Sequence, residues 1–572
     1  MSSSWFPAKP SNQSNGDSHP LLPSNGSPAF HDEDDDDAIE LEMGRFATNE
    51  RKPGLVARIQ RWPPWYFAVI AVGLLFLLWL LSPAKQALPP TTPTRDHTTE
   101  SHAKVDRLLA KQSTTLSQAE ARYELRNNRS PPPGFDVWFD FARQHSCLVD
   151  EYDQIARDFA PFYQLAEEDP RFFKKMVDLG TASMKEHGRG FSTGSFAGHS
   201  FELTNGEGTL YRDDWARTFG RFSEFLPDMN IILNGRDEPR SAFNYRRPNV
   251  KSQALHNSDP TPFEHSPHPT STFFKDEMKC IIPNQPKGFS EPANDASAFM
   301  LYASSTEFTT DLYPILSMTK ISPCFADILV PSEFYYSDCG WSPHYAYANN
   351  ITWSAKIPKI YWRGMNSGGR MYGDNYHAFP RFRLIDIARD HAELFDVKLS
   401  GFHGDLCYDE CNAEAIKAEY NIADESSPRE DVYRYKYVFD VDGNSFSGRY
   451  LGLLRSGTLV FKSTIFLEYF GDWLQPFEHY IPVLPDLSDL VDKLEWAVGH
   501  DDEARRIQQA GQVFAERILT DAQNDCYFSR VLLEWGRLYG MAERSLPADE
   551  ELDDDLEAEP FPGGHIPEIL DD

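Results

Sequence analysis

Short apolar runs that alternate with helical patterns are the feature that most constrains the fold of this chain. Six of them have the length and composition of buried strands, at residues 231–233, 360–362, 395–399, 435–441, 458–461 and 480–484. Residues 378–394 and 445–457 carry apolar side chains at helical spacing, and the chain after Asp486 is helical to about Glu543. Strands separated by helices predict an α/β fold with parallel strands, in which ligands bind at the carboxyl ends of the strands.

One apolar segment, residues 62–82, lies before this pattern. It has no charged side chain between residues 65 and 81 and is about long enough to cross a bilayer, so we predict a single transmembrane helix. A cleaved signal peptide is disfavoured because the run starts about sixty residues into the chain. A buried core helix is the alternative. Cations are concentrated before the run, which predicts a cytoplasmic N-terminus and a lumenal remainder, as in a type II membrane protein.

The charge distribution excludes one class of partner and helps to divide the chain into segments. The net charge of -32 argues against a nucleic-acid partner, because such proteins present a basic face to phosphates. The predicted segments are a disordered cytoplasmic tail at 1–61, the transmembrane helix at 62–82, a Thr- and Pro-rich stem at 83–130, an N-terminal lobe at 131–345, a C-terminal lobe at 346–545 and an acidic disordered tail at 546–572.

Features of a secreted or lumenal domain follow the apolar segment. Asn128 and Asn350 lie in glycosylation sequons on the predicted lumenal side. All seven cysteines also lie there, where disulfides persist. For Cys407 and Cys411 a disulfide or a pair of buried thiols is favoured over zinc, because no second Cys or His pair has zinc spacing.

The stretch KIYWRGMNSGGR, residues 359–370, is the first candidate for an anion site. Arg363 follows strand residues directly, and Ser367, Gly368 and Gly369 let the backbone approach a ligand and point amides at it. The alternative is a glycine-rich turn in which Arg363 pairs with a local carboxylate.

A second candidate lies in YVFDVDGNSFSGRYLGLLRSG. There we expect a strand to end at Asp442, Gly443 and Asn444 and a helix to start at Ser445 to Ser447, with Arg449 in its first turn. Two arginines and two amide-rich turns at strand ends would form a local positive pocket in an acidic protein, and a diphosphate is its natural occupant.

Two further carboxylates enter the prediction. Asp440 and Asp442 match an Asp-x-Asp pattern that binds a divalent metal in some enzymes, but we expect Asp440 to be buried or turned away from Asp442. Asp237 follows the strand at 231–233 and is a candidate general base; a surface pair with Arg236 is the alternative. No Walker loop, Rossmann glycine fingerprint or Gly-x-Ser-x-Gly elbow is present.

At these residues the chain resembles glycosyltransferase family 90, the group of protein O-glucosyltransferases and fungal capsule-associated proteins. Matching stretches occur in the family's order and cover about residues 131–540: PPPGFDVW, LPDMNIILNGRDEPR, KIPKIYWRGMNSGGR, YKYVFDVDGNSFSGRYLGLLRSGTLVFKS, EYFGDWLQPFEHYIPVLPDLSDL and DCYFSRVLLEW. Each is weak alone, and their order makes them specific.

The resemblance implies a GT-B fold, two Rossmann-like lobes with a cleft between them, and inverting transfer from a UDP-sugar without a metal or other cofactor. It implies Asp237 as the catalytic base and a disulfide between Cys147 and Cys526. The residues that it implies for binding the nucleotide sugar are Arg363, Gly364, Ser367, Gly368, Gly369, Asp442, Gly443, Asn444, Ser445, Ser447, Arg449 and Glu468.

The membrane segment and stem are similar to those of fungal members, which predicts a Golgi enzyme that transfers xylose or glucose to a hydroxyl of a glycan or glycoprotein. Two alternatives remain open. One is a lumenal glycan-binding or scaffold protein that keeps the fold without activity. The other is a phosphotransferase that uses Asp442 with a metal.

Overall fold

The structure, a computed structural model, describes residues 96–187, 191–205, 212–245, 264–265, 283–284, 291–292, 307–322, 324–339, 351–408, 410–423 and 427–544. These residues belong to one compact unit that begins at Thr91. The predicted transmembrane helix at 62–82 and both predicted tails lie outside the described residues. Within the described part of the chain, every helix is too short or too polar to span a bilayer.

The first sheet has five strands in the order β2-β1-β3-β8-β9. β1 pairs antiparallel with both β2 and β3, whereas β3, β8 and β9 run parallel. Its strands and the helix after β2 are β1 (Phe191–Ala197), β2 (Ser200–Asn205), α8 (Arg212–Gly220), β3 (Met229–Asn234), β8 (Leu316–Ser317) and β9 (Ile328–Leu329). The predicted strand at 231–233 lies within β3, whose centre is fully buried.

The second sheet has five parallel strands in the order β11-β10-β12-β13-β14. Its elements are β10 (Ile357–Met365), α11 (Pro380–Asp390), β11 (Phe395–Gly401), α12 (Ala413–Glu419), β12 (Tyr435–Val441), α13 (Tyr450–Leu454), β13 (Leu459–Ser463) and β14 (Ile481–Pro482). The predicted α/β class is therefore confirmed. Because all five strands run the same way, the turns after β10 and β12 lie at one edge of the sheet.

Helices from both ends of the described chain enclose the sheets. Before the first sheet come α3 (Thr98–Ala110), α4 (Leu116–Asn127), α5 (Phe135–Gln144), α6 (Asp153–Ala166) and α7 (Phe172–His187). After the second come α14 (Leu490–Gly499), α15 (Asp501–Arg517), α16 (Asp521–Tyr539) and α17 (Met541–Arg544). The helical region predicted after Asp486 is thus confirmed.

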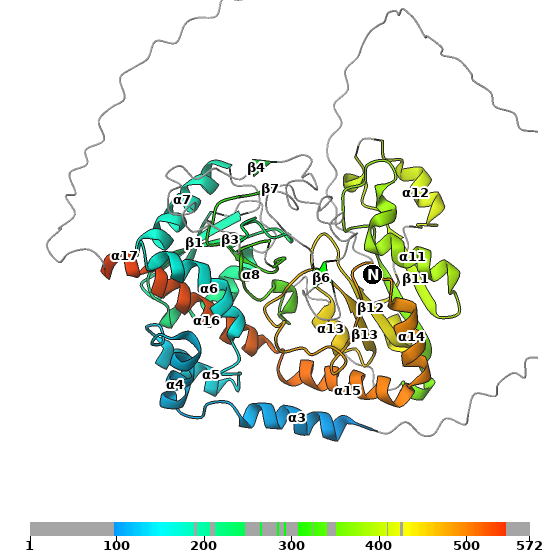
Figure 1. Ribbon diagram of the computed structural model, residues 1–572, viewed down its shortest axis with the longest axis horizontal. Helices are drawn as coiled ribbons and strands as arrows, with labels where there is room; N and C mark the ends of the chain where they lie inside the picture. Colours follow the sequence, from blue (N-terminus) through cyan, green and yellow to red (C-terminus); the bar gives the residue numbers. More distant parts are fainter. Residues whose placement is uncertain are drawn as a thin grey trace, which may run out of the picture. The chain divides into compact units, whose positions relative to one another are not determined.

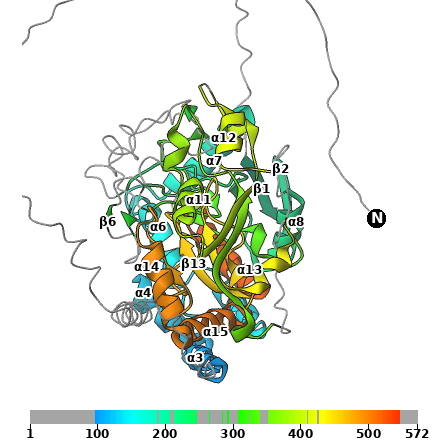
Figure 2. The ribbon, with the colours of Figure 1, turned by 90° about the vertical axis from the view of Figure 1, so that its right-hand side faces the viewer.

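The segment predicted as a stem contains α3 and α4. α3 lies along α15 (Figure 1 and Figure 2), where Arg517 forms an ion pair with Asp106 at 2.7 Å and the side chain of Gln509 accepts a hydrogen bond from the amide of His97. α4 begins where the side chain of Thr115 accepts a hydrogen bond from the amide of Gln118. These two helices are part of the compact unit.

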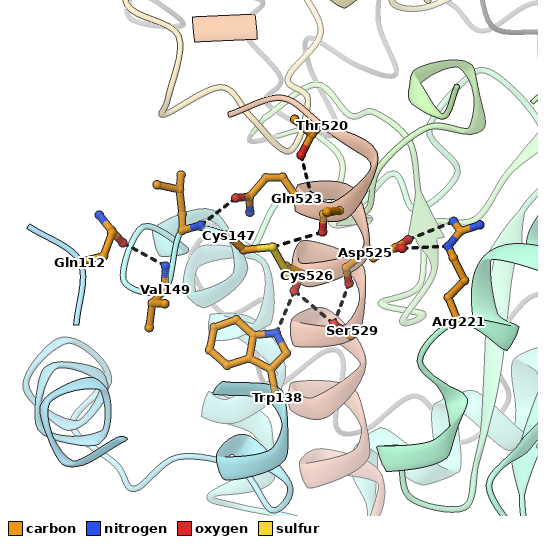
Figure 3. Close-up of a disulfide and its surroundings, with 12 residues drawn as sticks. Gln112, Trp138, Cys147, Val149, Arg221, Thr520, Gln523, Asp525, Cys526 and Ser529 are labelled. Carbon is orange, nitrogen blue, oxygen red and sulfur yellow. Dashed lines mark hydrogen bonds and ion pairs between the residues drawn. A yellow bond between two sulfur atoms is a disulfide. The ribbon is translucent and has the colours of Figure 1, made fainter. Parts of the chain in front are cut away.

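The last long helix, α16, is bound to the N-terminal helices by the disulfide that the resemblance implied. Cys147, after α5, bridges to Cys526 in α16, 379 residues away (Figure 3). The indole of Trp138 donates a hydrogen bond to the carbonyl of Cys526 at 2.9 Å, and Arg221 forms an ion pair with Asp525 on the opposite side of the helix. Nearly every side chain of α16 is buried, so this helix is a central packing element of the unit.

Loss of this disulfide should destabilise the protein strongly. Replacing Cys147 and Cys526 together by Ala should lower the free energy of unfolding by about 2–4 kcal/mol, because the bridge closes a very long loop in the unfolded chain. Urea unfolding followed by circular dichroism measures the change. Cys407 and Cys411 form a disulfide across only four positions and provide the control pair, for which a smaller effect is expected. An equal or larger loss from the control pair would contradict this account.

Candidate anion site at the strand ends

The turns after β10 and β12 meet at the carboxyl edge of the second sheet. The amide of Gly368 donates a hydrogen bond to the side chain of Asn444 at 3.3 Å. Gly368 has φ 119°, a conformation that favours glycine. A Cβ on Gly443 would lie 2.9 Å from a guanidinium nitrogen of Arg381 and 3.4 Å from the hydroxyl of Ser367. The structure therefore brings the two predicted turns together, as neighbours in one site.

Two arginines lie side by side at this edge. Arg381, the second residue of α11, donates from Nε to the carbonyl of Asp442 at 2.9 Å and from Nη1 to the carbonyl of Met365 at 2.8 Å. Arg449 donates from Nη1 to the carbonyl of Arg363 at 2.8 Å. Both guanidinium groups approach the ring of Trp362, at 5.6 and 6.0 Å from its centroid. Arg381 thus ties the ends of β10 and β12 to each other.

The charges of these arginines are not neutralised by an ion pair. Within the described residues, neither Arg381 nor Arg449 has a carboxylate oxygen within salt-bridge distance, and their hydrogen bonds go to main-chain carbonyls. Burial, together with the neighbouring charge of Arg449, lowers the pKa of Arg381 to about 9. A bound anion would favour the charged form of Arg381 and offset its repulsion by Arg449, so the pair has the electrostatics of an anion site.

Arg363 lies elsewhere, although it was a predicted member of the site. Its Nη2 forms an ion pair with Asp396 on β11 at 2.6 Å, and its guanidinium lies 4.6 Å from the ring centroid of Tyr361. Successive side chains of a strand point to opposite faces, so Arg363 and Trp362 diverge. The pairing with a local carboxylate, the alternative that the sequence left open, is the arrangement in the structure. Only the carbonyl of Arg363 reaches Arg449.

Sequence reasoning missed Arg381, although a signal was present. It follows Pro380, the first residue of α11, so its place in the first turn of a helix is readable from the sequence. A cation there is unfavourable because the helix N-terminus is itself positive. An arginine at this unfavourable position therefore indicates that its positive charge interacts with something other than the helix.

The predicted helix start at Ser445 to Ser447 is wrong. Residues 443–447 form a turn, and α13 begins only at Tyr450. The amide of Gly443 donates to the carbonyl of Ser445 at 2.8 Å, and the hydroxyl of Ser447 donates to Asp440. These local hydrogen bonds hold the segment out of the helix. Because α13 has only five residues, its dipole contributes little, and the positive charge of the site comes from the arginines.

Behind the turn lies a buried cluster of one lysine and three carboxylates. Lys462 on β13 forms ion pairs with Asp440 at 2.9 Å and with Glu468 at 3.7 Å. Asp442 accepts a hydrogen bond at Oδ2 from the amide of Ile465, while its buried Oδ1 has no hydrogen-bond partner among the residues that the structure describes. Asp440 is fully buried, as expected, but it does not turn away from Asp442, because residues two apart on a strand share a face.

Burial raises the pKa of both Asp442 and Glu468 to about 7. One lysine cannot offset three buried carboxylates, so the cluster carries protons near neutral pH. Among the described residues, no group of three or more His, Cys, Asp or Glu side chains is arranged to hold a metal ion.

A tyrosine from the predicted N-terminal lobe reaches this cluster. Tyr335, in the short helix η3 (Glu333–Tyr335), donates its hydroxyl hydrogen to Glu468 and lies 3.5 Å from the carbonyl of Ser447. Its ring packs against Phe446 and Phe470, at centroid distances of 6.1 and 5.6 Å. Glu468, which was predicted to lie beside the nucleotide, is thus a buried side chain behind the turn. It connects the two predicted lobes through Tyr335.

The candidate base lies on the first sheet. Asp237 is half-buried in the turn after β3, where the side chain of Asn234 donates to the carbonyl of Glu238 at 2.7 Å and accepts from the amide of Arg236 at 3.0 Å. Asn128 is exposed at the end of α4, which suits a glycosylation site. Asn350 lies outside the described residues.

The fold defines an α/β protein with a candidate anion site at the strand ends of a parallel sheet. Residues 345–556 match the family model of glycosyl transferase family 90. This region includes the second sheet and both turns, so the resemblance predicted from the sequence is confirmed.

Individual relatives match part of this chain. The chain is 34% identical to protein O-glucosyltransferase 2 of Danio rerio over 187 residues, which cover 32% of this chain and 34% of the relative. It is 29% identical to protein O-glucosyltransferase 3 of Homo sapiens over 212 residues, 37% of each chain. It is 35% identical to human protein O-glucosyltransferase 1 over 108 residues, 19% of this chain and 28% of the relative. The matches thus span about a third of the relatives' length or less.

The buried cluster should make stability depend on pH. The folded-state pKa of Glu468 is about 7, above its ordinary value of 4.5, so the native state binds more protons than the unfolded state between these values. The free energy of unfolding therefore falls as pH rises through this window. Glu468→Gln cannot titrate, and its loss of stability between pH 5 and 8 should be smaller by on the order of 2 kcal/mol. Urea unfolding at several pH values measures this. Parallel pH curves for the two proteins would contradict it.

Proposed function

We propose that this chain is an inverting glycosyltransferase that uses a UDP-sugar as donor. The observation that carries the proposal is the pair of adjacent guanidinium groups, Arg381 and Arg449, which have no carboxylate partner within the described residues. A diphosphate leaving group gains negative charge as the bond to the sugar breaks. Fixed cations aimed at that charge stabilise the transition state more than the ground state.

The two turns would surround the same leaving group. Main-chain amides at Ser367 to Gly369 and at Gly443 to Ser447, with the side chains of Asn444 and Ser445, would donate to the phosphates and ribose. The hydroxyl of Ser445 and Oδ1 of Asp442 are buried and find no hydrogen-bond partner in the described part of the chain. Such atoms are costly unless a ligand satisfies them. Gly364 leaves room for the Trp362 ring, which a Cβ there would meet at 2.5 Å.

Asp237 would act as the general base. β3 and β8 are parallel, so the turn after β3 lies at the same edge of the first sheet as Lys320, which follows β8. The main chain of Lys320 pairs with that of Leu467 at 3.1 and 2.7 Å, next to Glu468. This contact supports an arrangement in which Asp237 faces the site from the first sheet.

The proposed transfer is a single displacement and needs no covalent intermediate. Asp237 takes the proton of an acceptor hydroxyl, whose oxygen attacks the anomeric carbon. The bond from that carbon to the diphosphate oxygen breaks as the new bond forms, which inverts the configuration. The negative charge of the departing UDP is then held by Arg381 and Arg449.

The remaining features of the proposal follow from the family. Its relatives are named protein O-glucosyltransferases, and the matches are partial, so donor and acceptor are proposals. We propose xylose or glucose as the donor sugar, a glycan or glycoprotein as acceptor, a GT-B arrangement of the two halves, and a type II Golgi membrane protein that needs no metal. A non-catalytic glycan-binding protein is the second candidate. The absence of a carboxylate partner for Arg381 and Arg449 among the described residues favours the enzyme.

Binding of UDP tests the arginine pair. Arg449→Met should weaken UDP binding by about 2 kcal/mol, roughly 30-fold, because a charge-assisted contact is lost. Arg381→Lys keeps the charge but cannot reach both carbonyls, and it should weaken binding also. Arg363→Met is the control and should change the dissociation constant by less than about threefold, since its ion pair with Asp396 lies on the other face. Titration calorimetry measures all three. An effect of Arg363→Met as large as that of Arg449→Met would overturn the assignment.

Loss of the proposed base, Asp237, should affect turnover and not UDP binding. Asp237→Asn should lower the turnover of UDP-sugar by about 10²–10⁴-fold, because an amide cannot accept the acceptor proton. UDP affinity should stay the same, since Asp237 does not contact the diphosphate in this proposal. Turnover is followed by UDP release and UDP affinity by calorimetry. A variant with wild-type turnover would remove Asp237 from the mechanism.

A further inference from the structure

The loop after β11 carries an exposed aromatic ring beside the proposed donor site. Tyr408 is 41% exposed, which is unusual for a large side chain in this fold. Its ring lies parallel to that of Tyr372, with centroids 5.3 Å apart and an angle of 21° between the planes. The guanidinium of Arg370 lies 5.6 Å from the Tyr408 ring centroid. Tyr408 is thus packed against Tyr372 and Arg370 and is still partly exposed to solvent.

A disulfide constrains the chain on both sides of Tyr408. A disulfide joins Cys407 to Cys411 on either side of the ring. Glu410, inside the disulfide loop, has φ 64°, a left-handed conformation that a tight closed loop imposes. An exposed aromatic side chain on a closed loop loses little conformational freedom when a ligand binds, which favours a recognition role.

The same loop is fastened to the first turn of the anion site. The amide of Met371 donates to the carbonyl of Leu406 at 2.8 Å, and the amide of Tyr408 donates to the carbonyl of Met371 at 3.0 Å. The side chain of Asn366 accepts from the amide of His403 at 2.6 Å. Met371 and Asn366 flank Gly368, which contacts Asn444 of the second turn. Tyr408 is therefore placed by the very segment that the donor would touch.

Two carboxylates near the Tyr408 ring favour a neutral ligand over an anionic one. Asp405 and Glu410 are exposed on this loop and form no hydrogen bond or ion pair within the described residues. Carboxylates repel a nucleotide diphosphate but accept hydrogen bonds from neutral hydroxyl groups. The apolar C–H face of a pyranose ring stacks on an aromatic ring, while its hydroxyl groups point sideways to such acceptors.

We propose that Tyr408, with Asp405 and Glu410, forms a subsite for a neutral sugar of the acceptor. The acceptor of the transfer would then be a glycan, recognised through a sugar ring near the reacting hydroxyl, and not an unglycosylated peptide. This inference rests on the proposed function, because an acceptor subsite has meaning only beside a donor site.

Binding of simple glycosides to the full-length chain tests it. Saturation-transfer NMR with methyl β-xyloside, methyl β-glucoside and methyl α-mannoside, in the presence of UDP, should detect binding of at least one. Tyr408→Ala should weaken that binding by about threefold to tenfold, whereas Tyr408→Phe keeps the ring and should stay within about twofold. Phe477→Ala removes a similarly exposed ring, 44% accessible, on another part of the chain and should have no effect.

The outcomes separate this subsite from the proposed function. If the wild type binds UDP but none of the glycosides, or if Tyr408→Ala binds them as well as wild type does, the subsite is refuted. It is equally refuted if Tyr408→Ala weakens UDP and leaves glycoside binding unchanged, because the ring would then stack on the nucleotide base. If the wild type does not bind UDP at all, the proposed function fails instead. Unchanged thermal unfolding of Tyr408→Ala verifies that the variant is folded.

Discussion

The proposed function depends on two positive charges that lie close together, with no carboxylate of the described residues within salt-bridge distance. Arg381 and Arg449 repel each other, and burial adds to the cost of the charge on Arg381. Main-chain carbonyls of Asp442, Met365 and Arg363 partly compensate, but a carbonyl dipole is a weaker partner than a carboxylate. In a chain with a net charge of -32, we propose that an anion completes this pair.

Much of the fold was predictable, because strands and helices carry local signals. The strand at 435–441 was predicted with the bounds of β12, and the alternation of strands and helices specified the parallel sheet. The start of α13 was not predictable from propensity, since Ser447 bonds to Asp440 seven residues earlier. Such a contact depends on the folded turn and leaves no pattern in the sequence.

The sequence indicated the two turns of the candidate site but only some of its side chains. The structure brings both predicted glycine-containing turns and Arg449 together, because turns at strand ends are visible in sequence. Arg381, which was not predicted, lies beside Arg449, whereas the predicted Arg363 pairs with a carboxylate. That pairing is decided by β11, where Asp396 lies across from Tyr361. The link from Tyr335 to Glu468 joins residues 133 positions apart, and sequence spacing carries no information on it.

A crystal structure of the complex with UDP is the measurement that tests the central claim most directly. The account predicts diphosphate oxygens at about 3 Å from guanidinium nitrogens of both Arg381 and Arg449, with Arg363 still paired to Asp396. A diphosphate bound elsewhere, or one held by Arg363 after it has left Asp396, would contradict it.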